Sequence, residues 1–361
     1  MRGQGLGSIE TGRPKSLEPK TTNMRETDLT HLACPACLRD LIVRSVDDRK
    51  GAVLWSARLE CVACGGAYPV VRGIPRFVPN DNYASSFGLE WTKHARTQYD
   101  SYTGLNLSEK RFFEETRWPR RLSGQVVLEV GSGSGRFTEQ AASTGAFVVS
   151  MDYSGAVEAN FASNGAKPNV LVVQADVYRM PFPRGYFDKL FCLGMLQHTP
   201  DVHGAFSALP PMLKPGGELV VDVYRKALIG PFLQTKYYVR PLTRRVAPER
   251  LYQLTRRWVD AMWPLSRAIG RIPRIGHSIN WRLLVADYSF AGVTGELLKE
   301  WAYLDTFDML SPRYDSPQSI GTMRKWLATV GLTDVEVGKG YNGIEARGRK
   351  PARTTRIAEE C

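Results

Sequence analysis

Four cysteines form two closely spaced pairs near the start of the chain. Cys34 and Cys37 make one Cys-x-x-Cys turn, and Cys61 and Cys64 make another after a gap of 23 residues. Two such turns bring four thiolates together, which is the donor set of closed structural Zn²⁺ sites. A disulfide pair or a redox Cys-x-x-Cys motif is the alternative. The pattern favours structural zinc, because the protein fills all four positions and leaves none open for a substrate.

A glycine-rich turn follows an apolar run in the stretch "VVLEVGSGSGRF", which places Gly131, Gly133 and Gly135 on alternate positions. A dinucleotide-binding turn needs a glycine where Arg136 stands, and a phosphate-binding P-loop needs a Lys-Ser/Thr pair that is absent here. Glu129, just before the loop, would repel a pyrophosphate but would suit an ammonium group. The loop therefore favours a ligand with a cationic amino-acid end.

The same stretch resembles motif I of the class I S-adenosylmethionine (SAM)-dependent methyltransferases, E/D-x-G-x-G-x-G, of the type 11 group. Four later segments match that family in order: "VVSMDYS", "VVQADVYRMPF", "FDKLFCLGMLQHTPD" and "LKPGGELVVDVY". The resemblance covers about 100 residues. It implies an α/β fold with a doubly wound, Rossmann-like core of seven strands, and SAM as the cofactor.

The resemblance also implies which residues contact the cofactor. Asp152 ends the second strand and would accept both ribose hydroxyls, while Asp176 ends the third strand and would receive the adenine amino group. Each of these aspartates has an alternative role as a cap of the following helix. The implied cofactor contacts are Glu129, Gly131, Gly133, Gly135, Asp152, Tyr153, Asp176, Val177, Leu193 and Gly194.

Two residues are candidates for the chemistry itself. His198 follows the fourth strand, and a neutral imidazole there would take a proton from a hydroxyl or a carbon acid near neutral pH. Asp305 belongs to a polar stretch at 304–318, which we expect to form a loop over the site. His198 as a helix cap and Asp305 as a turn-capping residue are the alternatives. Further candidates are Asp308, Asp315, Trp91, Gln98 and Asp100.

Strands and helices alternate regularly from Gly124 to Tyr224, which is the βαβ rhythm of a mostly parallel sheet. The rhythm stops at a basic insertion and resumes with a helix, for which Ser316 and Pro317 predict the N-cap and first turn. Two short strands follow. The predicted strands of the alternating region are 126–130, 147–152, 170–174, 187–193 and 218–224.

These changes in composition and periodicity divide the chain into parts. The predicted parts are a disordered tail at 1–28, a zinc-ribbon domain at 29–79, a helical lead-in or lid at 80–123, a SAM-binding core at 124–224, a basic helical cap inserted after the fifth strand at 225–315, the C-terminal part of the core at 316–347 and a disordered tail at 348–361.

Positive charge is concentrated in the cap. The chain has a net charge of +12, and 13 Lys/Arg against two acidic residues lie between Arg225 and Arg282, a local net of +11. Arginines interleaved with aromatic residues suit RNA, an anionic membrane surface or a lipid-linked substrate. Solvated helices packed on the core are the plain alternative. With no apolar run of membrane-spanning length and no signal segment, we expect a cytoplasmic protein.

The cysteine-containing stretch "LECVACGGAYPVVRGIP" resembles the small zinc-ribbon proteins that activate RNA and protein methyltransferases. Together, the resemblances imply a methyltransferase that acts on an oxygen or carbon of a small-molecule, glycan or lipid-linked acceptor. The competing hypothesis is an RNA methyltransferase that binds nucleic acid through the ribbon and the cap.

Overall fold

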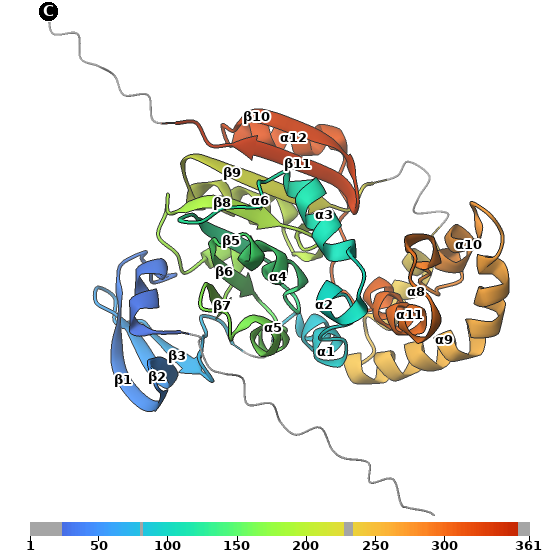
Figure 1. The fold of residues 1–361 in the computed structure, drawn as a ribbon, viewed down its shortest axis with the longest axis horizontal. Coiled ribbons are helices and arrows are strands. Elements are labelled where there is room, and N and C mark those ends of the chain that lie inside the picture. The colour runs from blue at the N-terminus through green and yellow to red at the C-terminus, as the bar shows by residue number, and fades with distance from the viewer. Residues whose placement is uncertain (1–23, 80–81, 227–233, 353–361) are drawn as a thin grey trace, which may run out of the picture.

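The computed structural model describes residues 24–79, 82–226 and 234–352 (Figure 1). The predicted tails at 1–28 and 348–361 lie largely outside these residues. Where they are described, both adjoin regular structure. Met24 is fully buried and Arg25 forms a β-bridge with Val53, so the end of the first predicted tail packs on the β-rich unit. The last strand extends to Arg349, past the predicted start of the second.

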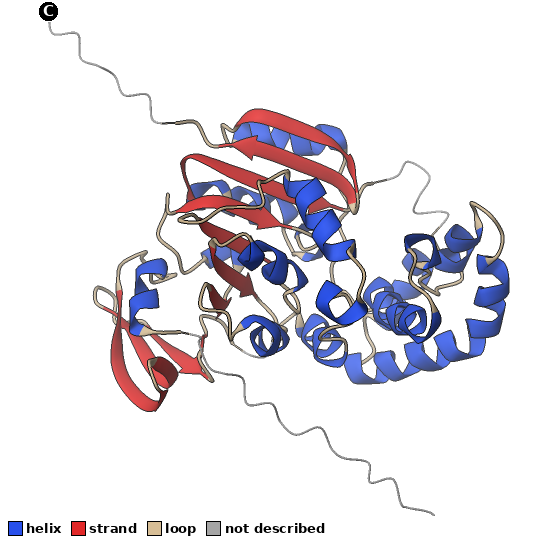
Figure 2. Ribbon diagram, viewed as in Figure 1, coloured by secondary structure: helices blue, strands red, loops and turns tan. Residues whose placement is uncertain are grey.

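The N-terminal unit is a four-stranded antiparallel sheet in the order β1-β2-β3-β4 (Figure 2). A short 3-10 helix, η1 (Glu26–His31), precedes it. Alternation of buried and exposed side chains along β2 gives the sheet one apolar face, as expected for a half-covered antiparallel sheet. The strands are β1 (Leu41–Lys50), β2 (Val53–Cys61), β3 (Ala67–Val71) and β4 (Ile74–Pro75).

The second sheet has seven strands in the order β10-β11-β9-β8-β5-β6-β7, which confirms the predicted doubly wound core. The pairs from β9 to β7 are parallel, whereas β11 runs antiparallel to β9 and to β10. The strands are β5 (Val126–Val130), β6 (Phe147–Asp152), β7 (Val170–Gln174), β8 (Phe187–Cys192), β9 (Leu213–Val223), β10 (Thr333–Gly340) and β11 (Gly343–Arg349).

Helices cover both faces of this sheet, so its inner strands are apolar on both sides. Along β5, Leu128 packs with the apolar residues of α6 and α12, and Val127 packs with those of α3, α4 and α5. The helix α12 begins at Ile320 with Ser319 as its N-cap, so the predicted cap at Ser316 is wrong. The helices are α3 (Leu107–Thr116), α4 (Arg136–Ser143), α5 (Val157–Asn164), α6 (Val202–Ala208) and α12 (Ile320–Thr329).

A helical cap inserted between β9 and α12 stands beside the sheet, with α9 along its outer edge (Figure 1). The lead-in helices α1 (Ser85–Lys93) and α2 (Asp100–Thr103) lie between the cap and the core. Residues 304–310 are the last turns of α11, which corrects the predicted loop at 304–318. The cap helices are α8 (Lys236–Thr243), α9 (Pro248–Gly270), α10 (Gly276–Arg282) and α11 (Gly295–Leu310).

Candidate active site

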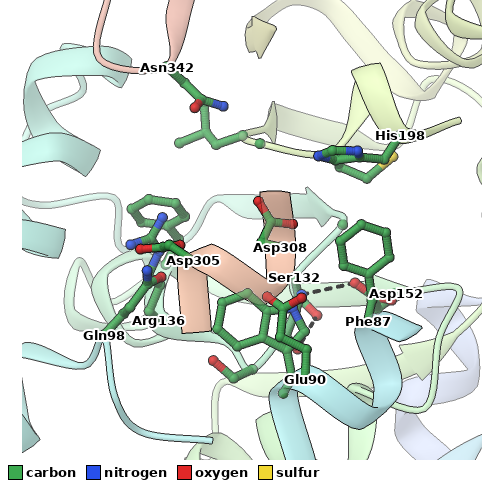
Figure 3. A pocket seen from close by; sticks show the side chains of 18 of the residues that line it. Phe87, Glu90, Gln98, Ser132, Arg136, Asp152, His198, Asp305, Asp308 and Asn342 are labelled. Atoms are coloured by element: carbon green, nitrogen blue, oxygen red, sulfur yellow. Dashed lines mark hydrogen bonds between the residues drawn. The ribbon is translucent and has the colours of Figure 1, made fainter. Parts of the chain in front are cut away.

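A cavity of about 380 Å³ opens at the carboxyl ends of β5, β6 and β8, where open α/β sheets bind their ligands (Figure 3). The sheet edge forms one wall, and α1 and α11 form the wall opposite. The residues that line the cavity include Phe87, Glu90, Trp91, Gln98, Gly131, Gly133, Arg136, Asp152, Tyr153, Val177, Leu193, Gly194, His198, Tyr224, Tyr288, Asp305 and Asp308.

Two of the three loop glycines lie at this cavity and leave no room for side chains. A Cβ on Gly131, which has φ +82°, would lie 2.4 Å from the Cβ of Met195. A Cβ on Gly133 would lie 3.0 Å from the indole nitrogen of Trp91, and the Gly133 N–H donates to Asp152 Oδ2 at 2.9 Å. The loop is therefore a bare backbone surface between the sheet and α1.

Glu129 and Gly135 were predicted as cofactor contacts, but neither is among the residues that line the cavity. The Glu129 carboxylate is buried and accepts hydrogen bonds from the hydroxyls of Thr138 and, at 2.7 Å, Ser150. Burial raises the pKa of Glu129 to about 7. A Cβ on Gly135 would lie 2.1 Å from Asn160 Oδ1, so this glycine permits close packing of α5.

The two strand-end aspartates also differ from each other. Asp152 lines the cavity, and its Oδ1 accepts hydrogen bonds from the N–H and hydroxyl of Ser154 at 2.8 and 2.7 Å. Asp176 does not line it, and its Oδ1 caps η2 (Val177–Arg179) by accepting the Tyr178 N–H at 3.0 Å. The ribose and adenine contacts of these residues stay predictions, and Asp176 has the capping role that was its alternative.

His198 lies at the end of η3 (Leu196–His198), lines the cavity and is 8% exposed. Its ring packs against Phe87 at 5.1 Å and edge-on against Tyr224 at 5.4 Å between centroids. Nδ1 lies 3.1 Å from the carbonyl oxygen of Tyr314. A carbonyl only accepts hydrogen bonds, so Nδ1 carries the proton and Nε2 of the neutral ring keeps its lone pair.

Three carboxylates line the wall opposite the sheet: Asp305 and Asp308 from α11, and Glu90 from α1 (Figure 3). Burial and the charge of Asp308 raise the pKa of Asp305 to about 7. Burial and both aspartates also raise the pKa of Glu90. The sequence reasoning missed Glu90, although a lone glutamate within the apolar stretch "SSFGLEW" was a signal for a buried charge.

Two other candidate carboxylates have structural partners. Asp100 accepts the N–H groups of Ser108 and Glu109 at 3.0 and 2.6 Å, so it caps the start of α3. Asp315 pairs with Arg240 and, at 3.4 Å, with Lys236. Neither lines the cavity beside the glycine loop.

A second cavity of about 570 Å³ continues from the first beneath α8 and α10. His198, Tyr224, Asp305 and Asp308 line both cavities, so they mark the boundary between the two. Glu90 lines the first cavity and is not among the residues of the second. This arrangement gives one chamber beside the glycine loop and another beneath the cap, with a histidine and two carboxylates where they meet.

Comparison with known proteins finds a match for the segment that forms the sheet-edge wall of the first chamber. Residues 128–221 match the family model described as "Methyltransferase domain". This segment resembles a methyltransferase domain. It includes the glycine loop, both strand-end aspartates and His198.

The curated relatives match over part of the chain. The chain is 35% identical over 107 residues to the "Ubiquinone biosynthesis O-methyltransferase" of Thiobacillus denitrificans, covering 28% of this chain and 45% of the relative. It is 30% identical over 172 residues to the "Demethylmenaquinone methyltransferase" of Beutenbergia cavernae, covering 44% of this chain and 66% of the relative. The chain thus spans about half the length of the curated relatives it matches.

Among solved structures, a SAM-dependent methyltransferase from Aquifex aeolicus aligns with a TM-score of 0.39 and 13% identity, over 75% of this chain and 99% of that one.

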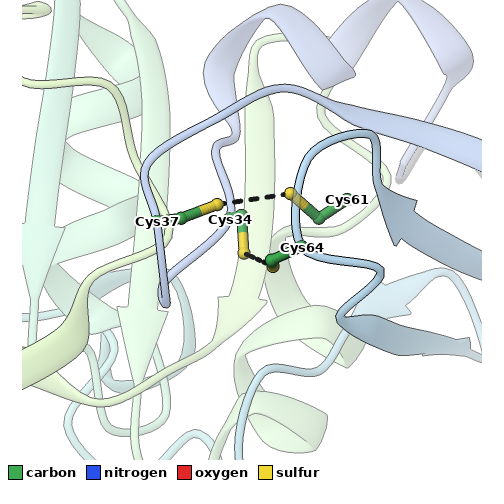
Figure 4. A group of neighbouring side chains, drawn as sticks. All are labelled: Cys34, Cys37, Cys61 and Cys64. Atoms are coloured by element: carbon green, nitrogen blue, oxygen red, sulfur yellow. Dashed lines mark hydrogen bonds between the residues drawn. The ribbon is translucent and has the colours of Figure 1, made fainter.

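Outside the methyltransferase domain, the four predicted zinc ligands come together at one end of the ribbon sheet (Figure 4). Their sulfur atoms all lie within 4.8 Å of one another, and the closest pairs, Cys34–Cys64 and Cys37–Cys61, are 3.6 and 3.4 Å apart. All four are free thiols. Tetrahedral coordination at about 2.3 Å places sulfurs about 3.8 Å apart, so the cluster fits one zinc ion.

The cap presents apolar side chains to solvent. Along α9, Leu254, Trp258 and Leu265 are 46%, 44% and 49% exposed and follow one another at helical spacing. Ile272 and Ile275 are exposed just beyond the helix. In the part of the chain that the structure describes, none of the helices combines the length and apolar composition needed to cross a membrane.

Proposed function

We propose that the chain is a SAM-dependent methyltransferase that transfers the methyl group to a hydroxyl oxygen of a small aromatic acceptor. The observation that carries this proposal is the position of His198 at the junction of the two chambers, with Nδ1 beside the Tyr314 carbonyl. In the neutral ring this carbonyl would hold the proton on Nδ1, which leaves Nε2 available as a base. A hydroxyl acceptor needs such a base, because its oxygen is a weak nucleophile until the proton leaves.

The first chamber fits the cofactor. The glycine loop would let the backbone of residues 131–133 approach the ligand closely, since side chains there would meet Met195 and Trp91. Asp152 and Tyr153 would hold the ribose side, with Val177 beside the adenine. At the methionine end, Gln98 and Arg136 would hold the carboxylate, a pairing that guanidinium groups favour.

The cofactor supplies an electrophilic methyl carbon on a sulfonium, and the chain supplies position and proton transfer. His198 Nε2 accepts the proton of the acceptor hydroxyl. The imidazolium that results keeps its Nδ1–H bond to the Tyr314 carbonyl, which stabilises the new positive charge. The packing of the ring between Phe87 and Tyr224 holds the base in place and excludes water from one side.

The acceptor class is supported by the second chamber and by the relatives. Tyr224, Tyr237, Trp281, Tyr288 and Phe290 give that chamber aromatic walls, which suit a planar ring. The names of both relatives contain a quinone: one is called a ubiquinone biosynthesis O-methyltransferase and the other a demethylmenaquinone methyltransferase. We therefore propose a hydroxylated aromatic ring as the acceptor, with methylation at carbon as the second outcome to be tested.

The ribbon is proposed to hold a structural zinc ion. Four cysteines fill the coordination sphere, and none of the residues of 24–79 lines the cavity beside the glycine loop. The unit is instead fixed to the sheet edge. The Ala33 N–H donates to the Pro181 carbonyl at 2.8 Å, and Arg76 donates to Gln174 Oε1 at 2.7 Å.

The exposed face of the cap is proposed to contact an anionic membrane surface, from which a lipid-soluble acceptor would enter. Leu254, Leu265, Ile272 and Ile275 are aliphatic and offer no plane on which a base stacks, whereas Trp258 suits either a base or a membrane interface. The aliphatic majority makes this face suit lipid better than RNA. The excess of Arg and Lys between 225 and 282 complements anionic headgroups.

The test is to incubate the purified chain with methyl-labelled SAM and an extract of its source cells, and to separate lipids, small molecules, protein and RNA. The proposal expects label in the lipid or small-molecule fraction, as an O-methyl ether by mass spectrometry. A labelled C-methyl product would move the acceptor atom to carbon. Label confined to RNA would overturn the proposal.

A further inference from the structure

The three carboxylates opposite the sheet edge are short of positive partners. Glu90 is 1% exposed, lines the first chamber, and its Oε2 has no hydrogen-bond partner. Asp305 Oδ2 is also buried without a partner. Among the described residues, Asp308 Oδ2 accepts a hydrogen bond from the Tyr224 hydroxyl alone, at 3.4 Å. No salt bridge within the described residues includes any of the three.

The nearby arginines compensate these carboxylates only in part: Arg136 and Arg111 act on Asp305 through space and oppose the rise of its pKa, but neither forms an ion pair with it. Arg111 pairs with Glu115 at 2.6 Å and with Asp222 at 2.5 Å. Arg136 packs its guanidinium over the Phe137 ring, and no ion pair to it is found among the described residues. Buried carboxylates that lack a cation are costly to a fold, and such groups collect where a ligand completes them.

We propose that Glu90, Asp305 and Asp308 form a subsite that binds a positively charged nitrogen of a ligand. The three side chains come from two helices, α1 and α11, and converge on one cavity. A metal ion suits them less well than an ammonium group. Residues that share a metal ion must bring their ligand atoms close together. In the described part of the chain, the four cysteines do so, with all ligand atoms within 4.8 Å of one another, and the three carboxylates do not.

The nitrogen has two sources, and the position of the subsite accommodates both. Glu90 faces only the first chamber, where the amino-acid end of the cofactor would lie. Asp305 and Asp308 face both chambers, so they also reach an amine on the acceptor. The inference rests on the proposed function for the identity of these ligands, but the recognition of an ammonium group follows from the carboxylates themselves.

The experiment is a set of calorimetric titrations at pH 8 of the full chain and of the variants Glu90→Gln and Asp305→Asn. S-adenosylhomocysteine carries the ammonium group, and 5′-methylthioadenosine lacks the amino-acid end. Glu296→Gln, an exposed glutamate on α11, is the control. If the cofactor supplies the nitrogen, both site variants weaken the binding of S-adenosylhomocysteine about tenfold or more and leave the binding of 5′-methylthioadenosine unchanged, because each variant removes a hydrogen bond between charged groups.

If the acceptor supplies it, S-adenosylhomocysteine binds every variant equally, and benzylamine titrated into the wild-type complex binds but is lost in the site variants. Two results would overturn the subsite. In the first, the wild type and both variants bind S-adenosylhomocysteine equally and also bind benzylamine equally. In the second, benzylamine does not bind the wild type and the affinity for S-adenosylhomocysteine is the same in all three proteins. A wild-type chain that binds neither nucleoside would instead contradict the proposed function. Thermal melting of each variant checks that it is folded.

Discussion

The ribbon and the cap are both additions to the same sheet, but they contribute to the molecule in opposite ways. The ribbon lies against β7 and gives the cavity beside the glycine loop none of its residues. The cap gives that cavity Tyr288, Phe290, Trp301, Asp305 and Asp308. We therefore expect the ribbon to serve stability, whereas the cap forms part of the cavity.

The kinds of residue that each addition buries explain this difference. The ribbon buries apolar side chains and brings together four thiols that a single zinc ion would satisfy. The cap buries carboxylates with unpartnered oxygens, which destabilise the empty protein. Groups that cost stability where a ligand binds are typical of functional sites.

Removal of zinc is expected to have the largest effect, and it should be an effect on stability. Structural zinc sites contribute about 10–16 kcal/mol to small domains, so Cys37→Ser should unfold the ribbon and lower the melting temperature of the whole chain. Cys361→Ser, a position outside the described residues, is the control for removal of a thiol. Metal analysis should find one zinc per wild-type chain, and an unchanged melting temperature after zinc removal would argue against a stabilising role.

Replacement of His198 should affect the rate without affecting cofactor affinity. His198→Ala is expected to lower kcat about 100-fold to 10,000-fold, because positioned general bases contribute about that much. The dissociation constant for S-adenosylhomocysteine should stay within about twofold. His203→Ala, at an exposed histidine of α6, is the matched control. Equal turnover by His198→Ala and wild type would exclude the base.

Asp305 in the cap should make the stability of the protein fall as the pH rises, which is the opposite of the effect of a salt-bridged carboxylate. Burial raises the pKa of Asp305 from 3.8 to about 7, so its contribution to stability is present at low pH and is lost as the pH rises through that interval. Asp305→Asn should therefore be more stable than wild type at pH 8, by up to about 4 kcal/mol at about 1.4 kcal/mol per pKa unit, and equally stable below pH 4. Denaturant titrations at the two pH values measure the difference, and a variant less stable at pH 8 would contradict the account.

The smallest expected effect on stability is on the outer face of the cap. Leu254→Ser with Leu265→Ser changes exposed side chains, and each should alter stability by no more than about 0.5 kcal/mol. Binding to vesicles that contain phosphatidylglycerol should fall about tenfold in a sedimentation assay. Val335→Ser, an exposed site on β10, should have no effect. Loss of RNA binding instead of vesicle binding would assign this face to nucleic acid.

The sequence predicted the parts of the molecule that follow from local pattern. The apolar runs of β5 to β9, the glycine loop and the two Cys-x-x-Cys turns each carry their signal in consecutive residues. The roles of Glu129 and Gly135 were not accessible, because they depend on Thr138 and Asn160 on neighbouring helices.

The wall opposite the sheet was the least predictable part. Glu90 and Asp305 are more than 200 residues apart in the sequence and meet only because the cap folds back over α1. The stretch from residue 304 is polar enough to predict a loop, but residues 304–310 continue α11. Leu304, Phe307 and Leu310 are buried there, and the last two pack in an apolar cluster of the cap. Tertiary packing overrode local pattern there.

The central claim is that the cavity at the sheet edge binds SAM, and titration with S-adenosylhomocysteine tests it most directly. Gly133→Val would place its side chain against Trp91 in the cofactor chamber, whereas Gly338→Val would meet open space. The account predicts one site per wild-type chain, an affinity about 100-fold weaker or undetectable in a folded Gly133→Val, and wild-type affinity in Gly338→Val. No binding by the wild type, or equal binding by Gly133→Val, would contradict it.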